Sequence, residues 1–335
     1  MRFFGKSVRT PNMGSRVPIL GIVGLAAFVL AILAATGQVV PLNRSEGGID
    51  SPQNAHSRGP IAPTVSGQSL LENAIHTLEG HRSISAKIRH SVDLFGNKPV
   101  GSGIYLEERS NRGLLFRLEL RIQLGNELSS LLDVCDGRYL WMYRKLWERE
   151  TLSRIHVGRV EQALEESGGI HEIGKVDRWP GLGGLPKLLR GLYRKYDFAS
   201  VQETSLEGRE GPLPVWRLEG EWKEAELAKL LPEQGEAVKG GKPADVSKLR
   251  PHLPDHVVLF LGKTDAFPYR IEYRRRRPNG RDGGEASRDK ALVTMELSEV
   301  DLNAAIHSTR FLYNPGDLEY SDETAEFLKK LGLVR

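Results

Sequence analysis

A group of metal-binding residue types stands in the second half of the chain. His252, Asp255 and His256 lie within one short stretch, and imidazole and carboxylate groups are common metal ligands. Pro251 and Pro254 interrupt this stretch, and proline cannot continue a helix that would present both imidazoles on one face. The sequence therefore favours an ordinary loop, and it predicts no metal site.

Other residues with chemical potential also have simple structural explanations. His90 occupies an apolar position of an expected strand, which favours a hydrogen-bonded core histidine over a ligand. Cys135 is the single cysteine, so it forms no internal disulfide and is better explained as a small core residue than as a nucleophile. The glycine-rich segment 181–184 could present backbone N–H groups to phosphate, but the start of a helix with Pro186 in its first turn is the simpler interpretation.

Motifs of the common enzyme classes are missing from the sequence. It contains no G-x-S-x-G elbow, no P-loop and no G-x-G-x-x-G after an expected strand. Nothing in it suggests a paired acid and base. The sequence therefore predicts a protein that is not an enzyme and that has no catalytic residues and no cofactor.

Two further groups of side chains can each be interpreted in two ways. The run Arg274–Arg277 could contact anionic lipid headgroups, or it could protect the end of a strand against edge pairing. Tyr139, Trp141 and Tyr143 share one face of an expected strand, where they could line a cavity or simply pack a core.

The distribution of charge argues against nucleic-acid binding. The 335 residues include 47 basic and 43 acidic side chains, a formal net charge of +4. Arg2, Lys6, Arg9 and Arg16 stand in the first sixteen residues, which contain no acid, so the rest of the chain is formally neutral. The basic excess therefore indicates membrane topology, and the sequence predicts no nucleic-acid partner.

An uncharged apolar segment follows this basic tail. Residues 17–40 are long enough to cross a bilayer, since a helix rises about 1.5 Å per residue and the hydrocarbon core is about 30 Å thick. The positive-inside rule then predicts a cytoplasmic tail, residues 1–16, and a single-pass inner-membrane protein whose C-terminal domain is extracytoplasmic or periplasmic. A signal peptide cleaved near Gln38 is the competing interpretation.

A linker and one domain make up the rest of the chain. Residues 41–68 are rich in Pro, Gly, Ser and Asn without apolar periodicity, which predicts a flexible linker. We expect one domain over residues 69–335. A capping box at Ser69–Glu72 predicts a short amphipathic helix at its start.

Alternating apolar and polar residues dominate the first half of this domain. In Leu114–Leu124 the even positions are apolar and the odd positions from Arg117 onward are polar, which predicts a strand with one buried face. Short turns such as Asp136–Gly137 join six such strands in meander order, so they should be antiparallel neighbours. Helices are expected over Val160–Glu166 and Leu185–Tyr196, before a second series of strands.

The second series is expected to contain five strands and a short edge element near Phe311. The segments Pro232–Pro254 and Pro278–Asp289 are rich in Gly, Pro and charge, which predicts mobile loops. A sheet of about eleven strands cannot stay flat. The sequence thus predicts a mainly β (α+β) fold, with a strongly curved antiparallel sheet, an incomplete β-barrel, wrapped over a few helices and preceded by one transmembrane helix.

Several of these elements together resemble a known family. The strand Ser83–Gly96, the turn and strand D-G-R-Y-L-W-M-Y at Asp136–Tyr143, the hairpin at Asp265–Arg270 and the segment Phe311–Pro315 are similar to the outer-membrane lipoprotein carrier (LolA-like) superfamily. The resemblance covers most of residues 70–316. It implies an incomplete barrel of about eleven strands around an apolar cavity for acyl chains. Members carry lipid or lipoprotein, or sense them in envelope-stress regulation.

This chain departs from the family in its expected membrane anchor and in its two long insertions. We therefore expect a membrane-tethered, non-enzymatic module that binds an acyl chain, a lipid or a lipidated protein on its concave apolar face. The alternative is an envelope sensor or scaffold that binds a protein partner and fills the hollow with its own helices. The expected cavity wall consists of Phe116, Leu118, Leu120, Tyr139 and Trp141.

Overall fold

The computed structural model describes residues 66–93, 98–111, 113–124, 127–146, 148–166, 183–276 and 289–333. The expected tail 1–16, the span 17–40 and nearly all of the linker 41–68 lie outside these ranges. Within them, no helix has both the length and the apolar character needed to cross a bilayer.

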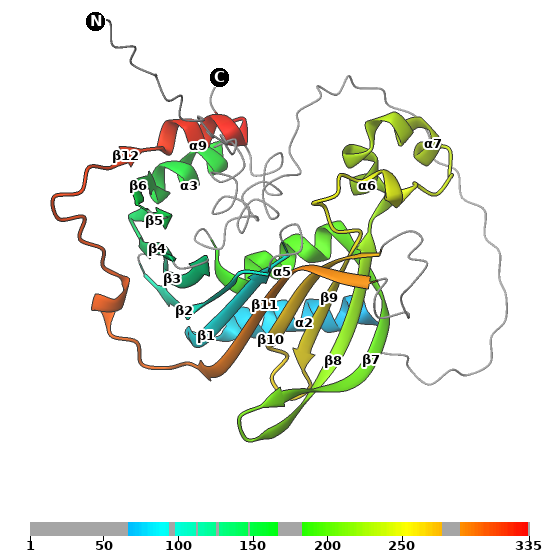
Figure 1. The fold of residues 1–335 in the computed structure, drawn as a ribbon, viewed down its shortest axis with the longest axis horizontal. Coiled ribbons are helices and arrows are strands. Elements are labelled where there is room, and N and C mark those ends of the chain that lie inside the picture. Colours follow the sequence, from blue (N-terminus) through cyan, green and yellow to red (C-terminus); the bar gives the residue numbers. More distant parts are fainter. Residues whose placement is uncertain are drawn as a thin grey trace, which may run out of the picture.

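One curved sheet of twelve strands forms the body of the molecule (Figure 1). Its order is β12-β6-β5-β4-β3-β2-β1-β11-β10-β9-β8-β7. The strands are β1 (Ser83–Val92), β2 (Val100–Ser110), β3 (Gly113–Leu124), β4 (Glu127–Asp136), β5 (Tyr139–Leu146), β6 (Arg149–His156), β7 (Tyr196–Gly208), β8 (Gly211–Trp222), β9 (His256–Gly262), β10 (Pro268–Arg276), β11 (Asp289–Leu302) and β12 (Ser321–Asp322).

Two antiparallel meanders share this sheet. Strands β1 to β6 form the first and β7 to β11 the second, and β1 pairs with β11 to join them. Ile88 of β1, for example, lies opposite Gly103 of β2 on one side and Leu297 of β11 on the other. The expectation of a wholly antiparallel sheet was wrong in one place, because the short strand β12 pairs parallel to β6. The sheet is therefore mixed and open.

The concave face of the sheet packs against helices α2 (Gly67–Gly80) and α5 (Gly184–Lys195) (Figure 1). Leu71, Ile75 and Leu78 of α2 belong to the same buried core as inward-facing residues of β1 to β6 and β8 to β11. Helix α2 begins earlier than the sequence suggested. Ser66 caps it, with its Oγ accepting a hydrogen bond from Ser69 N–H at 3.1 Å, so Ser69 is not the capping residue.

A strap of residues 303–323 crosses the convex face of β3 to β6 (Figure 1). Within it, Ser308–Phe311 is a 3-10 helix, so the expected edge strand near Phe311 was wrong. Phe311 is buried, and Arg117 of β3 donates a hydrogen bond to the carbonyl of Arg310 at 3.2 Å. Beyond β12 the chain ends in α9 (Thr324–Leu331), which packs on α3 (Val157–Glu166) and β6.

The segment between β8 and β9, expected as a mobile loop from Pro232 onward, is structured. It contains α6 (Glu224–Leu230), α7 (Gly235–Lys239) and two short 3-10 helices, Pro232–Gln234 and Val246–Lys248. Its own apolar cluster consists of Leu227, Leu231, Leu249 and Leu253. The Arg275 guanidinium of β10 holds the segment through hydrogen bonds to the carbonyls of Arg250 (2.7 Å), Leu253 (2.8 Å) and Leu249 (2.8 Å).

Candidate ligand-binding site

Strand register places three of the expected wall residues on the concave face. Phe116 lies opposite Cys135, which lies opposite Leu140, and all three are buried in the main core. Leu118 and Leu120 share the parity of Phe116 in β3 and belong to the same core. Tyr105 of β2 packs edge-on against the Phe116 ring, with centroids 5.5 Å apart. These residues form an apolar patch that reaches from β2 to β5.

Tyr139 and Trp141, the other two expected wall residues, lie on the opposite face. Trp141 is opposite Val134, which is opposite Arg117, so its side chain points to the convex side of the sheet. There the Trp141 ring packs against Tyr313 and Tyr320 of the strap, at 5.6 and 5.1 Å between centroids. The structure therefore does not bring the five residues together into one wall.

An arginine lies within this convex aromatic group. The Arg154 guanidinium is 4.4 Å from the Tyr139 ring centroid and 4.6 Å from that of Tyr320, and its Nε pairs with Asp322 at 3.1 Å. Such cation–π contacts contribute about 0.5–2 kcal/mol each. Tyr139 and Trp141 thus help to fasten the strap to β5 and β6.

Helix α5 covers the concave patch. Leu185, Leu188, Leu189 and Leu192 are buried and belong to the same core as Phe116. They recur at helical spacing, so one face of α5 is apolar. The part of the concave face beneath α5 is therefore filled by the chain itself.

A buried carboxylate holds the first turn of α5. The Leu185 N–H donates to Glu107 Oε2 at 3.1 Å and to Tyr105 Oη at 3.0 Å, while the Tyr105 hydroxyl donates to the same carboxylate at 2.5 Å. Gly184 is in the left-handed region, with φ of +66°, and a Cβ there would lie 2.2 Å from Glu107 Oε2. Only glycine permits this close approach.

Burial raises the pKa of Glu107, against the lowering effect of its hydrogen bonds to Tyr105 and Leu185 and of Arg109 nearby. Burial and the neighbouring Glu107 likewise raise the pKa of Tyr105 well above its ordinary value. The N-terminus of α5 is thus already occupied by an acidic group, which leaves no place for a phosphate at Gly183 and Gly184. The alternation of apolar residues gives no signal for Glu107, because it stands at an inward position of a strand where an apolar residue would be expected.

An ion pair joins β4 and β5 on the concave face. Asp133 Oδ1 is 2.6 Å from Arg144 Nη1, and Arg144 also donates to the carbonyls of Tyr143 (2.9 Å) and Leu132 (3.3 Å). Asp133 is opposite Leu118 on one side and Met142 on the other, which fixes its inward direction. The positive charge of Arg144 is therefore compensated within the protein.

Three neutral polar side chains also point inward. Among the described residues, Tyr273 Oη and Ser129 Oγ are buried without a hydrogen-bond partner. Burial lowers the pKa of His90, on β1, to about 4, so this imidazole is neutral at neutral pH. Sequence periodicity identified the inward direction of His90, and we find no sequence signal that marks Tyr273 and Ser129 as unpaired.

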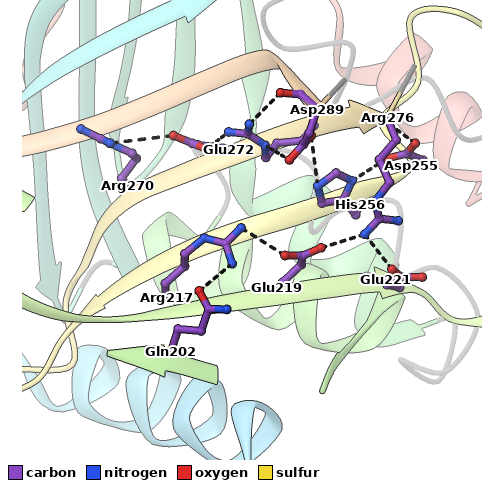
Figure 2. A network of polar contacts seen from close by, with 11 residues as sticks. Gln202, Arg217, Glu219, Glu221, Asp255, His256, Arg270, Glu272, Arg276 and Asp289 are labelled. Atoms are coloured by element: carbon purple, nitrogen blue, oxygen red, sulfur yellow. Dashed lines mark hydrogen bonds and ion pairs between the residues drawn. The ribbon is translucent and has the colours of Figure 1, made fainter. Parts of the chain in front are cut away.

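The convex side of β8 to β11 carries a network of charged residues (Figure 2). His256 is fully buried, with Nδ1 2.5 Å from Asp255 Oδ1 and Nε2 3.4 Å from Asp289 Oδ1. Arg276 pairs with Glu219 (2.7 Å) and Glu221 (2.8 Å). The described His, Cys, Asp and Glu residues include no group of three or more that could hold a metal ion.

The basic run at the end of β10 is engaged by the protein. Arg274 pairs with Glu272 and with Asp289, Arg275 binds backbone carbonyls, and Arg276 binds two glutamates, while Arg277 lies outside the described residues. The run does not protect a sheet edge, because β10 lies inside the sheet between β9 and β11. Cys135 is buried, and burial raises the pKa of its thiol to about 12, as expected for a core residue.

No protein-family model matches the chain, and no curated protein sequence matches it. Solved structures with similarity include one of the Pseudomonas aeruginosa MucA/MucB complex, with a TM-score of 0.35 and 12% identity over 74% of this chain and 60% of that chain. Lipoprotein LppX from Mycobacterium tuberculosis matches with a TM-score of 0.33 and 11% identity, over 72% of this chain and 100% of that chain.

A LolA superfamily protein from Nitrosomonas europaea matches with a TM-score of 0.24 and 12% identity, over 75% of this chain and 99% of that chain. LolA-superfamily structures are thus among those to which this chain is similar, as the sequence resemblance led us to expect. Because these scores and identities are low, the function proposed below rests on the geometry of this chain.

Proposed function

We propose that this protein is a non-enzymatic module that binds an apolar ligand, an acyl chain or a lipid, on the concave face of its sheet. The supporting observation is the single apolar face that both meanders share, from Leu140 of β5 to Leu218 of β8. In this proposal the open curved sheet acts as an incomplete barrel. Phe116, Leu118 and Leu120 form part of its ligand-facing wall.

Helix α5 must then move when ligand enters, because its leucines cover this wall. Its first turn is held mainly by the hydrogen bonds of Leu185 to Glu107 and Tyr105, a small attachment compared with its apolar face. An acyl chain gains about 0.8 kcal/mol for each methylene that it buries. Several buried methylenes together can therefore offset the loss of the contacts that the α5 leucines make with the wall. In this proposal α5 and the ligand therefore compete for the same apolar wall.

A titration of the chain from Ser66 onward with fatty acids of increasing length tests the proposal. Trp222 stacks on buried Tyr196, at 4.3 Å between centroids, and provides a fluorescence signal next to the core. We expect affinity to rise about threefold to fourfold for each added methylene. No binding at any chain length would refute the proposal.

A core variant adds a second test. Leu189→Ala removes a fully buried side chain of α5 and should destabilise the domain by about 2–5 kcal/mol. If α5 competes with ligand, the same change should tighten acyl binding. Leu227→Ala, in the separate cluster beside β8, is the matched control and should leave binding unchanged.

The second candidate is a sensor or scaffold that binds a protein partner. The closure of the core by α5 favours it, since a self-filled hollow has no need of a guest. Under this alternative Leu189→Ala would lower stability without creating acyl binding. The two candidates therefore predict different outcomes for one variant.

For the whole chain we propose a membrane-tethered protein. Residues 17–40 would form a single transmembrane helix in the inner membrane, with residues 1–16 in the cytoplasm and the sheet domain outside it. The support is the length of the uncharged segment and the basic tail before it. Lipid or a lipidated protein would reach the domain from the membrane surface, and an envelope protein is the partner under the alternative.

A further inference from the structure

Strand β7 is the last strand of the sheet, and no strand of the described residues pairs with its outer edge (Figure 1). At the opposite end of the sheet, by contrast, the chain returns and pairs β12 with β6. β7 is 13 residues long, whereas strands in globular proteins usually have about 5–6 residues. An open edge of this length presents a row of backbone donors and acceptors that another extended chain can use.

Helix α2 covers only the beginning of this edge. Gln68 Oε1 accepts a hydrogen bond from the Phe198 N–H at 3.2 Å, and Gln68 Nε2 donates to the Tyr193 carbonyl at 3.2 Å. A Cβ at Gly67 would lie 2.5 Å from the Phe198 carbonyl oxygen, so the N-terminus of α2 is in close contact with the strand there. In residues 200–208, by contrast, most side chains are exposed and no described strand lies beside the outer edge.

The pairing of β7 with β8 shows which backbone groups point outward. Pro214 of β8 lies opposite Ser205, and its carbonyl accepts from the Lys263 N–H at 3.2 Å, on the side of β8 that faces β9. Ser205 and Pro214 are therefore a non-hydrogen-bonded pair, and the N–H and C=O of Ser205 point to the open edge. Such pairs alternate with hydrogen-bonded pairs along an antiparallel ladder. The other outward-pointing residues are therefore Val201, Glu203 and Glu207.

The usual protections of an edge strand are missing from this stretch. Natural edge strands often carry lysine, proline or a bulge, which hinder pairing with another chain. Residues 200–208 contain no lysine and no proline, and the bulge lies before them, between Phe198 and Ser200. The two prolines of this hairpin, Pro212 and Pro214, are on β8 instead. The outer edge of β7 can thus accept a further strand.

The charges of β7 indicate the kind of chain that fits this edge. The strand contains Asp197, Glu203 and Glu207 and no basic residue. Lys263 pairs with Glu203 at 2.5 Å, but the Glu203 side chain is still 66% exposed. Glu203 and Glu207 lie on one face of β7, so a second copy of β7 at this edge would gather four glutamates there, which is unfavourable. A strand with basic side chains on that face would meet them favourably.

We propose that the outer edge of β7, from Val201 to Glu207, binds an extended segment of another protein as an additional strand, and that this segment carries basic residues at alternate positions. Main-chain hydrogen bonds would supply affinity, and the two glutamates would supply the preference for basic side chains. The proposal does not depend on acyl binding at the concave face, because it uses the backbone groups of the sheet edge.

The experiment uses the full chain held in a zwitterionic nanodisc and two short labelled peptides, one alternating threonine with lysine and the other threonine with glutamate. Fluorescence anisotropy measures their binding. We expect the lysine peptide to bind about tenfold more tightly, the effect of two exposed ion pairs.

A proline variant tests the role of the backbone. Ser205→Pro removes an outward N–H that makes no hydrogen bond to β8, a position at which an edge strand tolerates proline. It should weaken binding of the lysine peptide about fivefold, the effect of one lost hydrogen bond. Ser205→Ala keeps the N–H, so this matched control should bind the peptide like the native chain.

Hydrogen exchange of the native chain, read at single-residue resolution, needs no variant. The amides of Glu203 and Ser205 should exchange fast in the free chain and slowly when the lysine peptide is bound. The amides of Thr204 and Leu206 point to β8, so they should be protected in both states. Bound peptide should therefore convert an alternating pattern of protection into a continuous one.

Several results would overturn the proposal. One is failure of both peptides to bind, and others are equal binding of the two peptides or a Ser205→Pro variant that binds the lysine peptide like the native chain. Protection of the outward amides in the free chain would show that the chain's own residues occupy the edge. Self-association that Ser205→Pro abolishes, without peptide binding, would show that a second copy is the occupant.

Discussion

Phe116 and Arg121 lie on the same strand with opposite surroundings. Phe116 is fully buried against α5 and β4, whereas the Arg121 side chain is 66% exposed on the convex face. Phe116→Asp would bury an unpaired charge and should lower the free energy of unfolding by about 3–5 kcal/mol. Urea unfolding of the purified domain measures this change.

Arg121→Gln is the control for this prediction. Its ion pair with Glu119 is exposed, and such pairs contribute about 0–1 kcal/mol. Similar losses of stability in the two variants would contradict the assignment of the two faces.

Glu107 should make stability depend on pH. Because burial raises its pKa, the folded chain binds this proton more tightly than the unfolded chain does. The resulting stabilisation is present at low pH and is lost as the pH rises from the ordinary glutamate range through the raised pKa. Glu107→Gln, whose amide oxygen still accepts from Leu185, should remove that loss.

The measurement is the difference in unfolding free energy between the native chain and the Glu107→Gln variant across this pH range. The variant should gain relative to the native chain as the pH rises. A difference that stays constant with pH would mean that Glu107 titrates alike in the folded and unfolded states.

The site was only partly predictable at the level of single residues. Alternation within β3 correctly identified Phe116, Leu118 and Leu120 as inward residues. It could not show which residues of β5 share the inward face of β3, because this depends on the pairing register between the strands. A shift of one residue in that register turns every side chain of a strand to the other face of the sheet. Trp141 is opposite Val134 and therefore points outward.

Among the elements, the strap yields a prediction of its own. Phe311→Ala removes a buried ring between the strap and the convex face, so it should cost about 3–5 kcal/mol and expose residues 303–323 to protease. Leu312→Ala, at a neighbouring side chain that is 61% exposed, should change neither quantity. Limited proteolysis followed by mass spectrometry compares the two variants, and equal cleavage would show that Phe311 does not anchor the strap.

Helices and strands whose apolar residues recur regularly over many positions were predicted correctly, whereas elements that depend on tertiary contacts were not. Strands β1 to β11 and helix α5 follow from local alternation and helical spacing. Strand β12 consists of two polar residues, and its position depends on the contact between Asp322 and Arg154. The cluster that contains Leu249 and Leu253 was not predicted, because two isolated leucines near prolines show no helical or strand periodicity. Their segment is instead held by hydrogen bonds from Arg275, which lies on the distant strand β10.

For the whole molecule, we expect the N-terminal segment to be retained. Residues 17–40 exceed the apolar length of about 7–15 residues that signal peptides use. The intact mass of protein extracted from membranes should therefore include residue 1 or 2. A mature N-terminus near Gln38 would contradict retention and would release the domain from the membrane.

The junction between β1 and β11 has a consequence for how the chain is made. β1 begins at Ser83 and its partner β11 ends at Leu302, so one edge of β1 stays open until almost the entire domain has been synthesised. Contacts between such distant segments form slowly, and an unpaired strand edge can recruit another chain in the meantime. Chains truncated before Asp289 should self-associate in light scattering, unlike the complete domain. The nascent first meander would therefore depend on a chaperone to keep neighbouring nascent chains apart.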